Sequence, residues 1–418
     1  MTDWPAFQWR GFMHDAGRNF QDIALLKRFV NVMVQYKMNI FHFHLTDNPG
    51  YRIECRVHPE LNDPKNYLPT RQPGKFYTYK QLNDFIAYCA QRGIKVVPEI
   101  DMPGHSAYFQ RAFGVTMQSK KGTQILTDCL NEFLANVHTE YFHMGSDEVS
   151  VRNAAFMDQM ADLIRKHGRK LLVWRPGHLP SGKVITQLWT KYGKSVPQMP
   201  AVDSRNDYVN AMDPFIGPLR VLNLATDGKP SGDNLALGGT LCLWPDVNIG
   251  ADQMNIYRQN PVFPALLAAA ENYWHGGMVS RPEDWTHLPS DTNDAAFVQY
   301  AAFEARMVVH RDLYFRDWPF PYVKQANLVW KVIGPFNLKH HPLVERDLRA
   351  SYVVDGKTFR WVEARGATLH INHFWYGASV LPAAKEGVAY ALTYVWSPRA
   401  QTVGFWIGFN DPIRSSRK

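Results

Sequence analysis

Cysteine is scarce in this sequence, and the four copies, Cys55, Cys89, Cys129 and Cys242, stand far from one another. No two of them form a CxxC pair, the usual spacing of cysteine ligands in a zinc site. Four widely spaced cysteines in 418 residues are also too few for a disulfide scaffold. The sequence therefore predicts free, buried thiols and no cysteine-based metal site.

Long apolar runs are absent as well. No stretch approaches the roughly 20 apolar residues that cross a bilayer. The first residues also lack the basic segment followed by an apolar one that marks a secretory leader. We therefore expect a soluble chain without a membrane partner. Its location is expected to be periplasmic or secreted if a leader was removed, and cytoplasmic otherwise.

Basic runs are missing too, although the chain carries 46 Lys and Arg against 38 Asp and Glu, a formal net charge of +8. The longest basic clusters are Lys120-Lys121 and the tail at 414–418. A nucleic-acid-binding arm would concentrate such residues. The charge therefore predicts a basic surface or basic groups at an active site, and no nucleic-acid partner.

What the sequence does contain is a repeated alternation of short β-type runs and helical patterns. Helical segments such as 23–37, 79–92 and 154–168 carry apolar residues at spacings of three and four, and a last helix at 295–315 would close a ring. The eight β-type runs span 7–15, 38–47, 93–101, 139–147, 169–174, 183–189, 199–204 and 238–244.

Eight strands with interposed helices predict a (β/α)₈ TIM barrel over residues 1–318. An open doubly wound sheet is the alternative, weakened by the lack of a GxGxxG turn after the first run. Beyond the Pro-rich segment 318–324, alternating runs without helical spacing predict a small all-β, sandwich-like domain over 319–418. These runs include 358–364, 367–375, 388–396 and 402–409.

Reactive residues of a TIM barrel stand at the carboxyl ends of its strands, so the residues that end each run are the informative ones. Carboxylates there can transfer protons to a glycosidic oxygen, and flat indole rings stack on sugar faces. The residues at these positions are Asp15, Arg18, His44, Asp47, Glu99, Asp101, His105, Asp147, Glu148, Trp174, Trp189, Trp244 and Asp246. Together they predict a sugar-cleaving site.

A metal-dependent hydrolase is the alternative reading of the same strand ends, because histidines alternating on one strand face, with carboxylates nearby, resemble a ligand set. The possible ligands are His42, His44, Asp47, Asp101 and His105. A metal site, however, requires neither three tryptophans nor a pair of adjacent acids. We therefore expect no metal and no cofactor.

The adjacent acids Asp147 and Glu148 are the most specific feature. The two carboxyl groups of a typical retaining glycosidase lie about 5–5.5 Å apart across the sugar, and those of an inverting one about 6.5–9.5 Å apart. Neighbours at one strand end do not easily straddle a sugar. They can act from one side if one protonates the leaving oxygen while the other holds a group already on the substrate.

The segment HMGSDEV at 143–149 resembles the catalytic signature of glycoside hydrolase family 20, the β-N-acetylhexosaminidases. The similarity continues, in the expected order, through 9–18, 38–54, 95–106 and 238–246. Because the first β-type run begins at residue 7, the domain that often precedes the barrel in that family is expected to be missing. The β-rich segment after the barrel is not part of the shared pattern.

The resemblance implies a retaining exo-β-N-acetylhexosaminidase that releases terminal β-GlcNAc or GalNAc through an oxazolinium intermediate. Glu148 would be the general acid and base, and Asp147 would orient the substrate's acetamido group as nucleophile. Tyr208 resembles the tyrosine that donates to the acetamido carbonyl. The expected partner is a glycan with a non-reducing terminal N-acetylhexosamine.

The resemblance also implies the residues that hold the sugar. Trp174, Trp189 and Trp244 would clasp the acetamido methyl group and the ring. Arg10 would hold the 3- and 4-hydroxyls of the non-reducing end, which makes cleavage exo-acting.

Four further residues are expected to support the site. Asp47 and His105 would form a pair behind Glu148, while His143 and Glu99 would support the site without reacting. A catalytically inactive glycan-binding protein is the non-enzymatic alternative, but such a protein has no reason to keep the adjacent acids.

The pattern around the sugar's O4 and O6 departs from the family. There, a Tyr-x-Asp and a Trp-x-Glu element supply two carboxylates, whereas here the corresponding acids read Asn210 and Asp246. The basic residues near the same strand ends are Arg175, Lys191 and Arg205. Because an amide does not repel an anion, we hypothesise that a 6-O-sulfated GlcNAc is accepted.

Overall fold

A computed structural model describes most of the chain. The described residues are 3–190, 192–205, 207–210, 217–245, 252–277, 288–366, 369, 371, 380–382, 386–402 and 404, with Asn210 and Gly217 described by their backbone alone.

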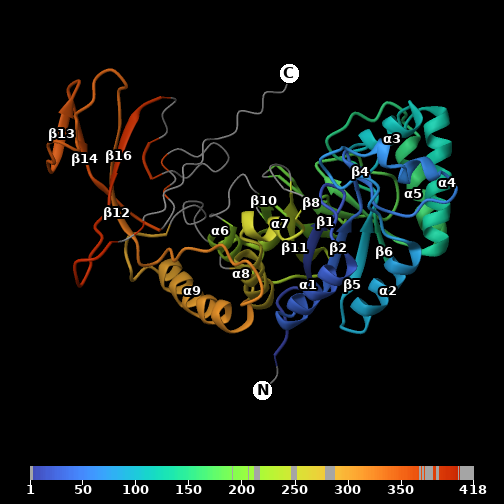
Figure 1. The fold of residues 1–418 in the computed structure, drawn as a ribbon, viewed down its shortest axis with the longest axis horizontal. Helices are drawn as coiled ribbons and strands as arrows, with labels where there is room; N and C mark the ends of the chain where they lie inside the picture. Colours follow the sequence, from blue (N-terminus) through green and yellow to red (C-terminus); the bar gives the residue numbers. More distant parts are fainter. Residues whose placement is uncertain are drawn as a thin grey trace.

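A closed parallel barrel occupies the first two thirds of the chain (Figure 1). Each strand overlaps one of the eight predicted runs, and the pairing of the first strand with β11 closes the ring, so the predicted TIM barrel is confirmed. The barrel strands are β1 (Trp9–Asp15), β2 (Ile40–His44), β5 (Lys95–Glu99), β6 (Tyr141–His143), β7 (Lys170–Arg175), β8 (Ile185–Leu188), β9 (Ala201–Asp203) and β11 (Ala236–Trp244).

One strand was not predicted. β10 (Tyr208–Asn210) pairs with the carboxyl-terminal end of β11, beyond the stretch of β11 that pairs with β9. Its three residues are too short to show a period in the sequence. The strand matters because it brings Tyr208 beside Cys242 in the sheet register.

The helices that cover the barrel owe their positions to amphipathic faces and to caps. The Asp22 side chain accepts from the Leu25 N–H at the start of the first helix, and Thr78 forms a capping box with Gln81 at the second. The helices are α1 (Ile23–Gln35), α2 (Tyr79–Ala90), α3 (Ala107–Phe113), α4 (Lys120–Asn136), α5 (Phe156–Lys166), α6 (Gly217–Asn223), α7 (Asn255–Gln259), α8 (Val262–His275) and α9 (Ala295–Tyr314). In the described stretches, β7–β8 and β8–β9 are joined without a helix.

The prediction that helix 295–315 closes the ring is wrong. The helix that packs against β1 and β11 is α8, and α9 lies outside it against α6 and α8. Nearly all of α8 is buried, with a central run of apolar residues at 265–270, so it has no polar face to produce a three-and-four spacing.

Short elements fill the connections between strands and helices. They are β3 (Thr46–Asp47), β4 (Gly50–Tyr51), and the 3₁₀ turns η1 (Pro59–Asn62), η2 (Pro64–Asn66) and η3 (Thr226–Gly228). The β3–β4 hairpin directly follows β2 and carries Asp47 to the mouth of the barrel.

The residues after the barrel form small antiparallel sheets beside α9, away from α4 and α5 (Figure 1). One sheet has the order β15-β12-β16, and the other is the hairpin β13–β14. The strands are β12 (Val329–Phe336), β13 (Ser351–Val354), β14 (Lys357–Arg360), β15 (Val362–Arg365) and β16 (Val388–Leu392). The predicted antiparallel β-structure is thus present, while most of the runs 367–375 and 402–409 lies outside the described residues.

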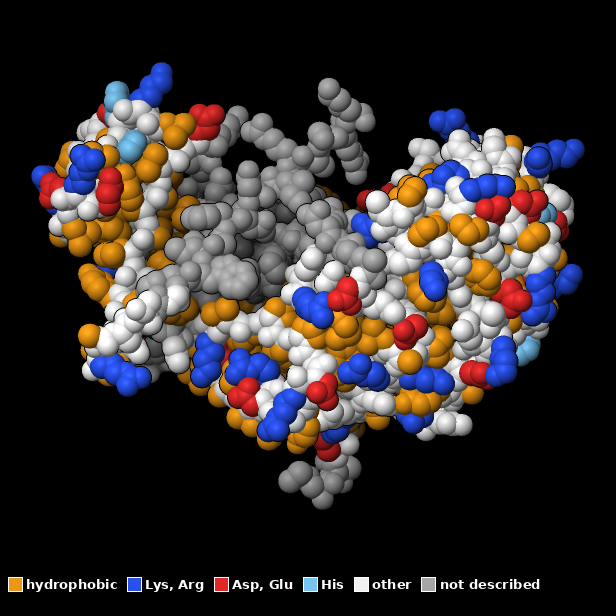
Figure 2. Space-filling model, viewed as in Figure 1, with side chains coloured by type: hydrophobic (Ala, Val, Ile, Leu, Met, Phe, Trp, Pro, Cys, Tyr) orange, Lys and Arg blue, Asp and Glu red, His pale blue; other side chains and the backbone are white. Residues whose placement is uncertain are grey.

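Three expectations from composition can be compared with the structure. The four cysteines are free and buried, as predicted. Lys and Arg side chains are interspersed with Asp and Glu on the face shown in Figure 2, in keeping with a scattered charge. Among the described residues, no helix has the length and apolar character needed to span a bilayer.

The barrel interior has an apolar lower layer. Trp9, Ile40, Val97, Leu172 and Val202 come from the amino-terminal half or the middle of five strands and pack together in the barrel. Because side chains alternate along a strand, the next inward positions on β2 and β5 are His42, His44 and Glu99. The interior therefore changes from apolar to polar towards the carboxyl ends of the strands.

Candidate active site

Four polar residues lie side by side at the upper rim of the barrel. The strand register pairs Asp15 with His44, His44 with Glu99, and Glu99 with His143. All four are fully or almost fully buried. Buried charges require partners, so the contacts among these residues decide what the site can do.

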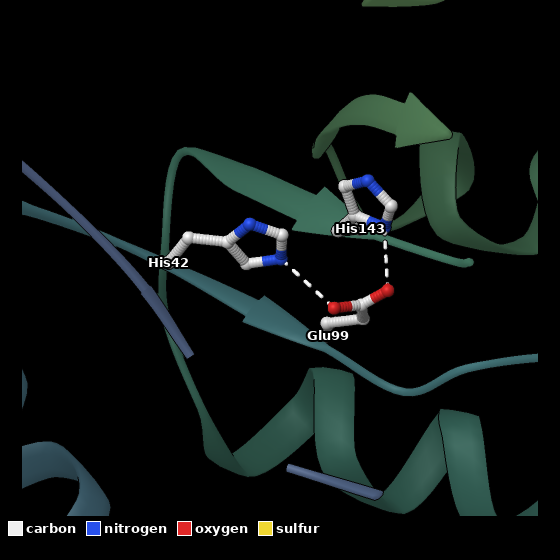
Figure 3. A group of neighbouring side chains, drawn as sticks. All are labelled: His42, Glu99 and His143. Carbon is white, nitrogen blue, oxygen red and sulfur yellow. Dashed lines mark hydrogen bonds and ion pairs between the residues drawn. The ribbon is translucent and has the colours of Figure 1, made fainter. Parts of the chain in front are cut away.

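Glu99 is the centre of a hydrogen-bonded cluster, part of which is drawn in Figure 3. Its Oε2 atom lies 2.9 Å from His42 Nε2 and 2.5 Å from His44 Nδ1. Its Oε1 atom accepts from Trp174 Nε1 at 2.7 Å and lies 3.0 Å from His143 Nδ1. Burial disfavours the charged form of Glu99, but the three histidines outweigh it and hold the pKa of the carboxyl well below its usual range.

The same side chains were the basis of the metal-site alternative. His42, Glu99 and His143 lie close enough to hold an ion, and so do Asp101, His105 and Asp147. In the first group, however, His42 Nε2 is paired with a carboxylate oxygen of Glu99, and His143 Nδ1 lies against the other (Figure 3). Glu99 thus accounts for one ring nitrogen of each histidine, which favours a supporting role for the carboxylate, while His42 Nδ1 and His143 Nε2 have no hydrogen-bond partner among the described residues.

A second chain of contacts runs from His44 to the mouth of the barrel. His44 Nε2 lies 3.1 Å from Asp47 Oδ2, which is 3.3 Å from His105 Nδ1. His105 Nε2 in turn lies 3.4 Å from Glu148 Oε2. Burial lowers the pKa of His105, but hydrogen bonds to Asp47 and Glu148 outweigh it and raise the pKa to about 12. An imidazolium therefore stands between the two carboxylates.

Asp147 and Glu148 are adjacent in sequence but occupy different surroundings. Asp147 is 8% exposed, and its Oδ1 atom has no hydrogen-bond partner among the described residues. The Glu148 side chain is 45% exposed. Burial raises the pKa of Asp147 to about 7, with the His105 charge opposing this and Glu99 and Glu148 adding to it.

The two acids lie in a strained turn. Ser146 and Glu148 adopt positive φ angles of 95° and 51°, a region that residues other than glycine seldom occupy. At Gly145, with φ of 70°, an added Cβ would lie 1.7 Å from Asp101 Oδ1. Glycine is therefore required there, and the turn gives Asp147 and Glu148 their different exposures.

Aromatic side chains gather next to these acids. Met13, Trp174 and Cys242 form a buried cluster against which Trp189, Tyr208 and Trp244 pack. The Trp174 and Trp244 rings are 5.9 Å apart, and Tyr208 stands edge-on to Trp244 at 5.8 Å. Burial raises the pKa of Tyr208, and the charges of Asp147 and Glu148 act in the same direction. The three predicted tryptophans and the tyrosine are thus brought together.

Arg10 does not lie at this site, and its predicted role is wrong. It is the second residue of β1, at the opposite end of the strand from Asp15. Its guanidinium donates to the Lys37 and Phe7 carbonyls and lies over Trp274. The pattern WRGFMHDAGR contains two arginines, and only the second follows the carboxyl end of the strand.

Arg18 is the arginine at the site. Its Nη1 atom lies 2.7 Å from Asp15 Oδ2 and 3.1 Å from Asp47 Oδ2. Its guanidinium stands 4.9 Å from the centre of the Trp244 ring. Arg18 thus presents a cation and several N–H donors between the carboxylate chain and the aromatic cluster.

Other site residues escaped the sequence analysis or received no role in it. Asp101 is buried against the Gly145–Ser146 turn, and burial together with Asp147 raises its pKa well above the usual range. Arg71 donates to the Arg18 and Pro245 carbonyls and so joins two sides of the mouth. Arg71 comes from a loop without any periodic pattern, so only the fold reveals it.

The residues predicted to face a sulfate are only partly described. Asn210 pairs with Trp244 in the sheet register, whereas Asp246 and Lys191 lie outside the described residues. Arg205 lies 2.8 Å from Asp203 Oδ2 and donates to the Gly193 carbonyl. Arg175 donates to the Gly177 carbonyl. Arg205 is therefore already paired, and it does not add a free basic group to a sulfate-binding site.

Comparisons with known proteins agree with this geometry. Residues 7–123 match the model of the glycosyl hydrolase family 20 catalytic domain. A β-hexosaminidase of Vibrio furnissii is 36% identical over 183 residues, which cover 36% of this chain and 30% of that protein. A β-hexosaminidase of Porphyromonas gingivalis is 27% identical over 334 residues, 67% of this chain and 40% of that protein. The chain thus spans well under two thirds of these relatives.

Solved structures share the fold. The β-N-acetylhexosaminidase of Bacteroides fragilis superposes with a TM-score of 0.58 at 24% identity, over 77% of this chain and 73% of that one. A β-hexosaminidase of Streptomyces plicatus superposes with a TM-score of 0.57 at 20% identity, over 77% and 70% of the two chains. The family match over residues 7–123 and the curated relatives thus make this chain similar to the catalytic domain of glycoside hydrolase family 20, and the solved structures show the same barrel fold.

Proposed function

We propose that this protein is a retaining exo-β-N-acetylhexosaminidase that uses its substrate's acetamido group as the nucleophile. The observation that carries the proposal is the contrast within one turn: a buried Asp147 with an unpartnered oxygen, and a more exposed Glu148 held against His105. Two carboxylates so placed suit different tasks on one side of a sugar.

Glu148 suits proton transfer to and from the leaving oxygen. Its side chain reaches solvent, and its Oε2 atom lies 3.4 Å from His105 Nε2. In the proposed reaction, Glu148 protonates the glycosidic oxygen while the acetamido carbonyl attacks C1. It then removes a proton from the water that opens the cyclic intermediate.

Asp147 suits the acetamido group. Its Oδ1 atom is buried without a partner among the described residues, and an acetamido N–H would supply one. A buried acceptor left unpaired is costly, so binding the substrate relieves that cost and favours the ionised form. The carboxylate then holds the group in line with C1 and stabilises the charge that develops on its nitrogen.

The aromatic cluster and Arg18 suit the rest of the sugar. The apolar surface of Trp244, which packs against the buried Trp174, matches an acetamido methyl group and a pyranose face, and the Tyr208 hydroxyl can donate to the acetamido carbonyl. We assign to Arg18 the hydroxyls of the non-reducing end, the role that Arg10 does not fill. A site that binds this end of a glycan releases one sugar at a time.

The printed names of the curated relatives support the same activity. Those of Vibrio furnissii and Porphyromonas gingivalis are β-hexosaminidases, and a Cellulomonas fimi relative, 32% identical over 201 residues, is a β-N-acetylhexosaminidase. These names describe the relatives, and the choice between GlcNAc and GalNAc in this protein is left to experiment.

The test is hydrolysis of 4-nitrophenyl β-GlcNAc and β-GalNAc, with the first-formed anomer followed by ¹H NMR. A β-anomer is expected, together with inhibition by a thiazoline analogue of the cyclic intermediate that is about 10²-fold or more tighter than by free GlcNAc. No cleavage of either sugar would favour a glycan-binding protein. Activity lost on EDTA dialysis and restored by zinc would favour a metal-dependent hydrolase.

The proposed substrate extends to GlcNAc carrying a 6-O-sulfate. The support is the amide of Asn210, on the strand next to Trp244, where the family pattern has an acid. The test compares kcat/KM on 4-nitrophenyl β-GlcNAc and its 6-sulfate in wild type and in Asn210→Asp. If wild type has a kcat/KM about 10-fold lower on the 6-sulfate than on the unsulfated substrate, and Asn210→Asp leaves this ratio unchanged, the extension to sulfated GlcNAc is wrong.

A further inference from the structure

Glu99 receives more partners than a carboxylate in a barrel core requires. Two nitrogen atoms lie within 3.0 Å of each of its oxygens, and they come from β2, β6 and β7. The residue is fully buried, so none of these partners can be replaced by solvent. Three of the contacts, those with Trp174, His143 and His44, lead onwards along two branches of the site.

The first branch leads to the aromatic cluster. The Trp174 indole N–H donates to Glu99 Oε1 at 2.7 Å, which fixes the rotation of the ring that packs against Trp244. His143, whose Nδ1 lies 3.0 Å from Glu99 Oε1, reaches the turn that carries the two acids, because the Gly145 N–H donates to the same Nδ1 atom with an N···N distance of 3.0 Å.

The second branch leads to the proton-transfer side chain. Four consecutive contacts join Glu99 to Glu148 through His44, Asp47 and His105, at 2.5, 3.1, 3.3 and 3.4 Å. Carboxylates and imidazoles alternate along this chain. Each charge therefore has the opposite charge as its neighbour, the arrangement that stabilises buried ions.

We propose that Glu99 is a positioning residue that sets two properties of the site at once, the orientation of the aromatic wall and the protonation of the acid/base pair. The inference rests on the proposed function, which assigns sugar binding to the aromatic cluster and proton transfer to Glu148. It adds that both ends depend on one buried carboxylate that does not itself touch the substrate.

The charged groups around the second branch determine whether loss of the Glu99 charge raises or lowers the pKa values of His105 and Glu148. His44 faces Glu99, Asp15 and Asp47, while His105 faces Asp47, Asp101, Asp147 and Glu148. Burial disfavours a charge on His44, yet the surrounding carboxylates raise its pKa well above the usual range. Without the Glu99 charge, His44 loses its proton. Because His44 lies nearer than Glu99 to His105 and Glu148, the potential there becomes more negative and their pKa values rise.

The decisive variant is Glu99→Gln, which keeps the size of the side chain and removes its charge. One carbonyl oxygen cannot serve all the donors around it, so kcat/KM is expected to fall about 5- to 100-fold. The alkaline limb of the pH profile is expected to move upwards by about half a pH unit or more. His42→Gln is the matched control for the second branch, because His42 contacts the same oxygen and is not a link between His44 and Glu148, although its ring lies against His143 and Trp174.

Two further variants separate the branches. Trp174→Phe removes the N–H and keeps an aromatic ring, so KM is expected to rise while the pH profile stays in place. His44→Gln interrupts the other chain, so the pH profile is expected to move while KM changes less. If Glu99→Gln and His42→Gln lower activity equally and neither moves the pH profile, Glu99 is a packing residue and the proposal is wrong.

A measurement without turnover separates this proposal from the proposed function. In protein with ¹⁵N-labelled histidine, His44 is expected to remain an imidazolium at pH 8 in wild type and to be neutral in Glu99→Gln, with His44→Gln identifying the signal. If wild type cleaves no β-N-acetylhexosaminide, the proposed function is wrong. The protonation state of His44 still tests the proposed network from Glu99 to Glu148. If His44 is neutral at pH 8 in wild type, the network proposal fails whatever the activity.

Discussion

The lower and upper halves of the barrel interior are built from the same strands and differ in chemistry. Below, Ile40, Val97 and Leu172 pack as an apolar layer. Above, His44, Glu99 and Trp174, further along the same three strands, form a hydrogen-bonded network. The lower half stabilises the fold through burial alone, whereas the upper half is stable only if every charge has a partner. Along each strand, the residues of the lower half thus serve stability and those of the upper half serve the site.

The sharpest test of the upper half is Glu148→Gln. Loss of the proton donor is expected to lower kcat on a natural oligosaccharide by about 10²- to 10⁴-fold. A 4-nitrophenyl leaving group needs little protonation, so its release is expected to suffer less. Steady-state kinetics on both substrates measure the difference, and near-native turnover of the oligosaccharide would remove Glu148 from its assigned role.

Asp147→Asn is expected to lower kcat/KM by about 10²- to 10³-fold on good and poor leaving groups alike, because attack by the acetamido group is impaired in both. In wild type, burial raises the pKa of Asp147 to about 7, so kcat/KM is expected to decline as pH falls through that value. The variant should lack this acidic limb. An unchanged limb in Asp147→Asn would assign it to another group.

The same shift makes Asp147 a cost to stability. Its folded pKa of about 7 lies above the ordinary aspartate value, so the folded state binds the proton more tightly than the unfolded chain. The free energy of unfolding therefore falls as pH rises between these two pKa values, by an amount on the order of 1–3 kcal/mol. Thermal unfolding of Asp147→Asn at pH 5 and pH 8 should show a gain over wild type that is larger at pH 8.

Arg10 in β1 and Arg18, three residues beyond the carboxyl end of β1, test the difference between the two ends of this strand. Arg18→Lys removes the forked geometry beside Asp15 and Asp47, and KM is expected to rise about 10- to 100-fold. Arg10→Lys, at the other end, is expected to leave KM within about 2-fold of wild type. A larger rise in KM for Arg10→Lys than for Arg18→Lys would reverse the assignment.

The smallest expected effect on activity comes from the lower layer. Leu172→Ala should reduce the free energy of unfolding by about 2–5 kcal/mol, because it leaves a cavity among fully buried side chains. Its KM and pH profile are expected to match those of wild type at a temperature where both are folded. A shifted pH profile would mean that the two halves of the interior are coupled.

The sequence was most informative where a local pattern repeats. All eight barrel strands overlapped predicted runs, because strand-length apolar segments bounded by turns do not depend on distant neighbours. The adjacent acids and the three tryptophans could likewise be placed at strand ends. α8 and β10 were not found, since one is buried on nearly all sides and the other is three residues long.

The sequence by itself determined which residue types stand at the mouth of the barrel, because strand order and side-chain alternation follow from spacing along the chain. Only the tertiary structure decided which of them share a proton or a charge. Whether Arg10 or Arg18 reaches the site depends on which end of β1 each occupies, and the link from Glu99 to Glu148 depends on contacts of a few ångströms between distant segments. Electrostatic interactions depend on such distances and on burial, and neither is written in the spacing of residues.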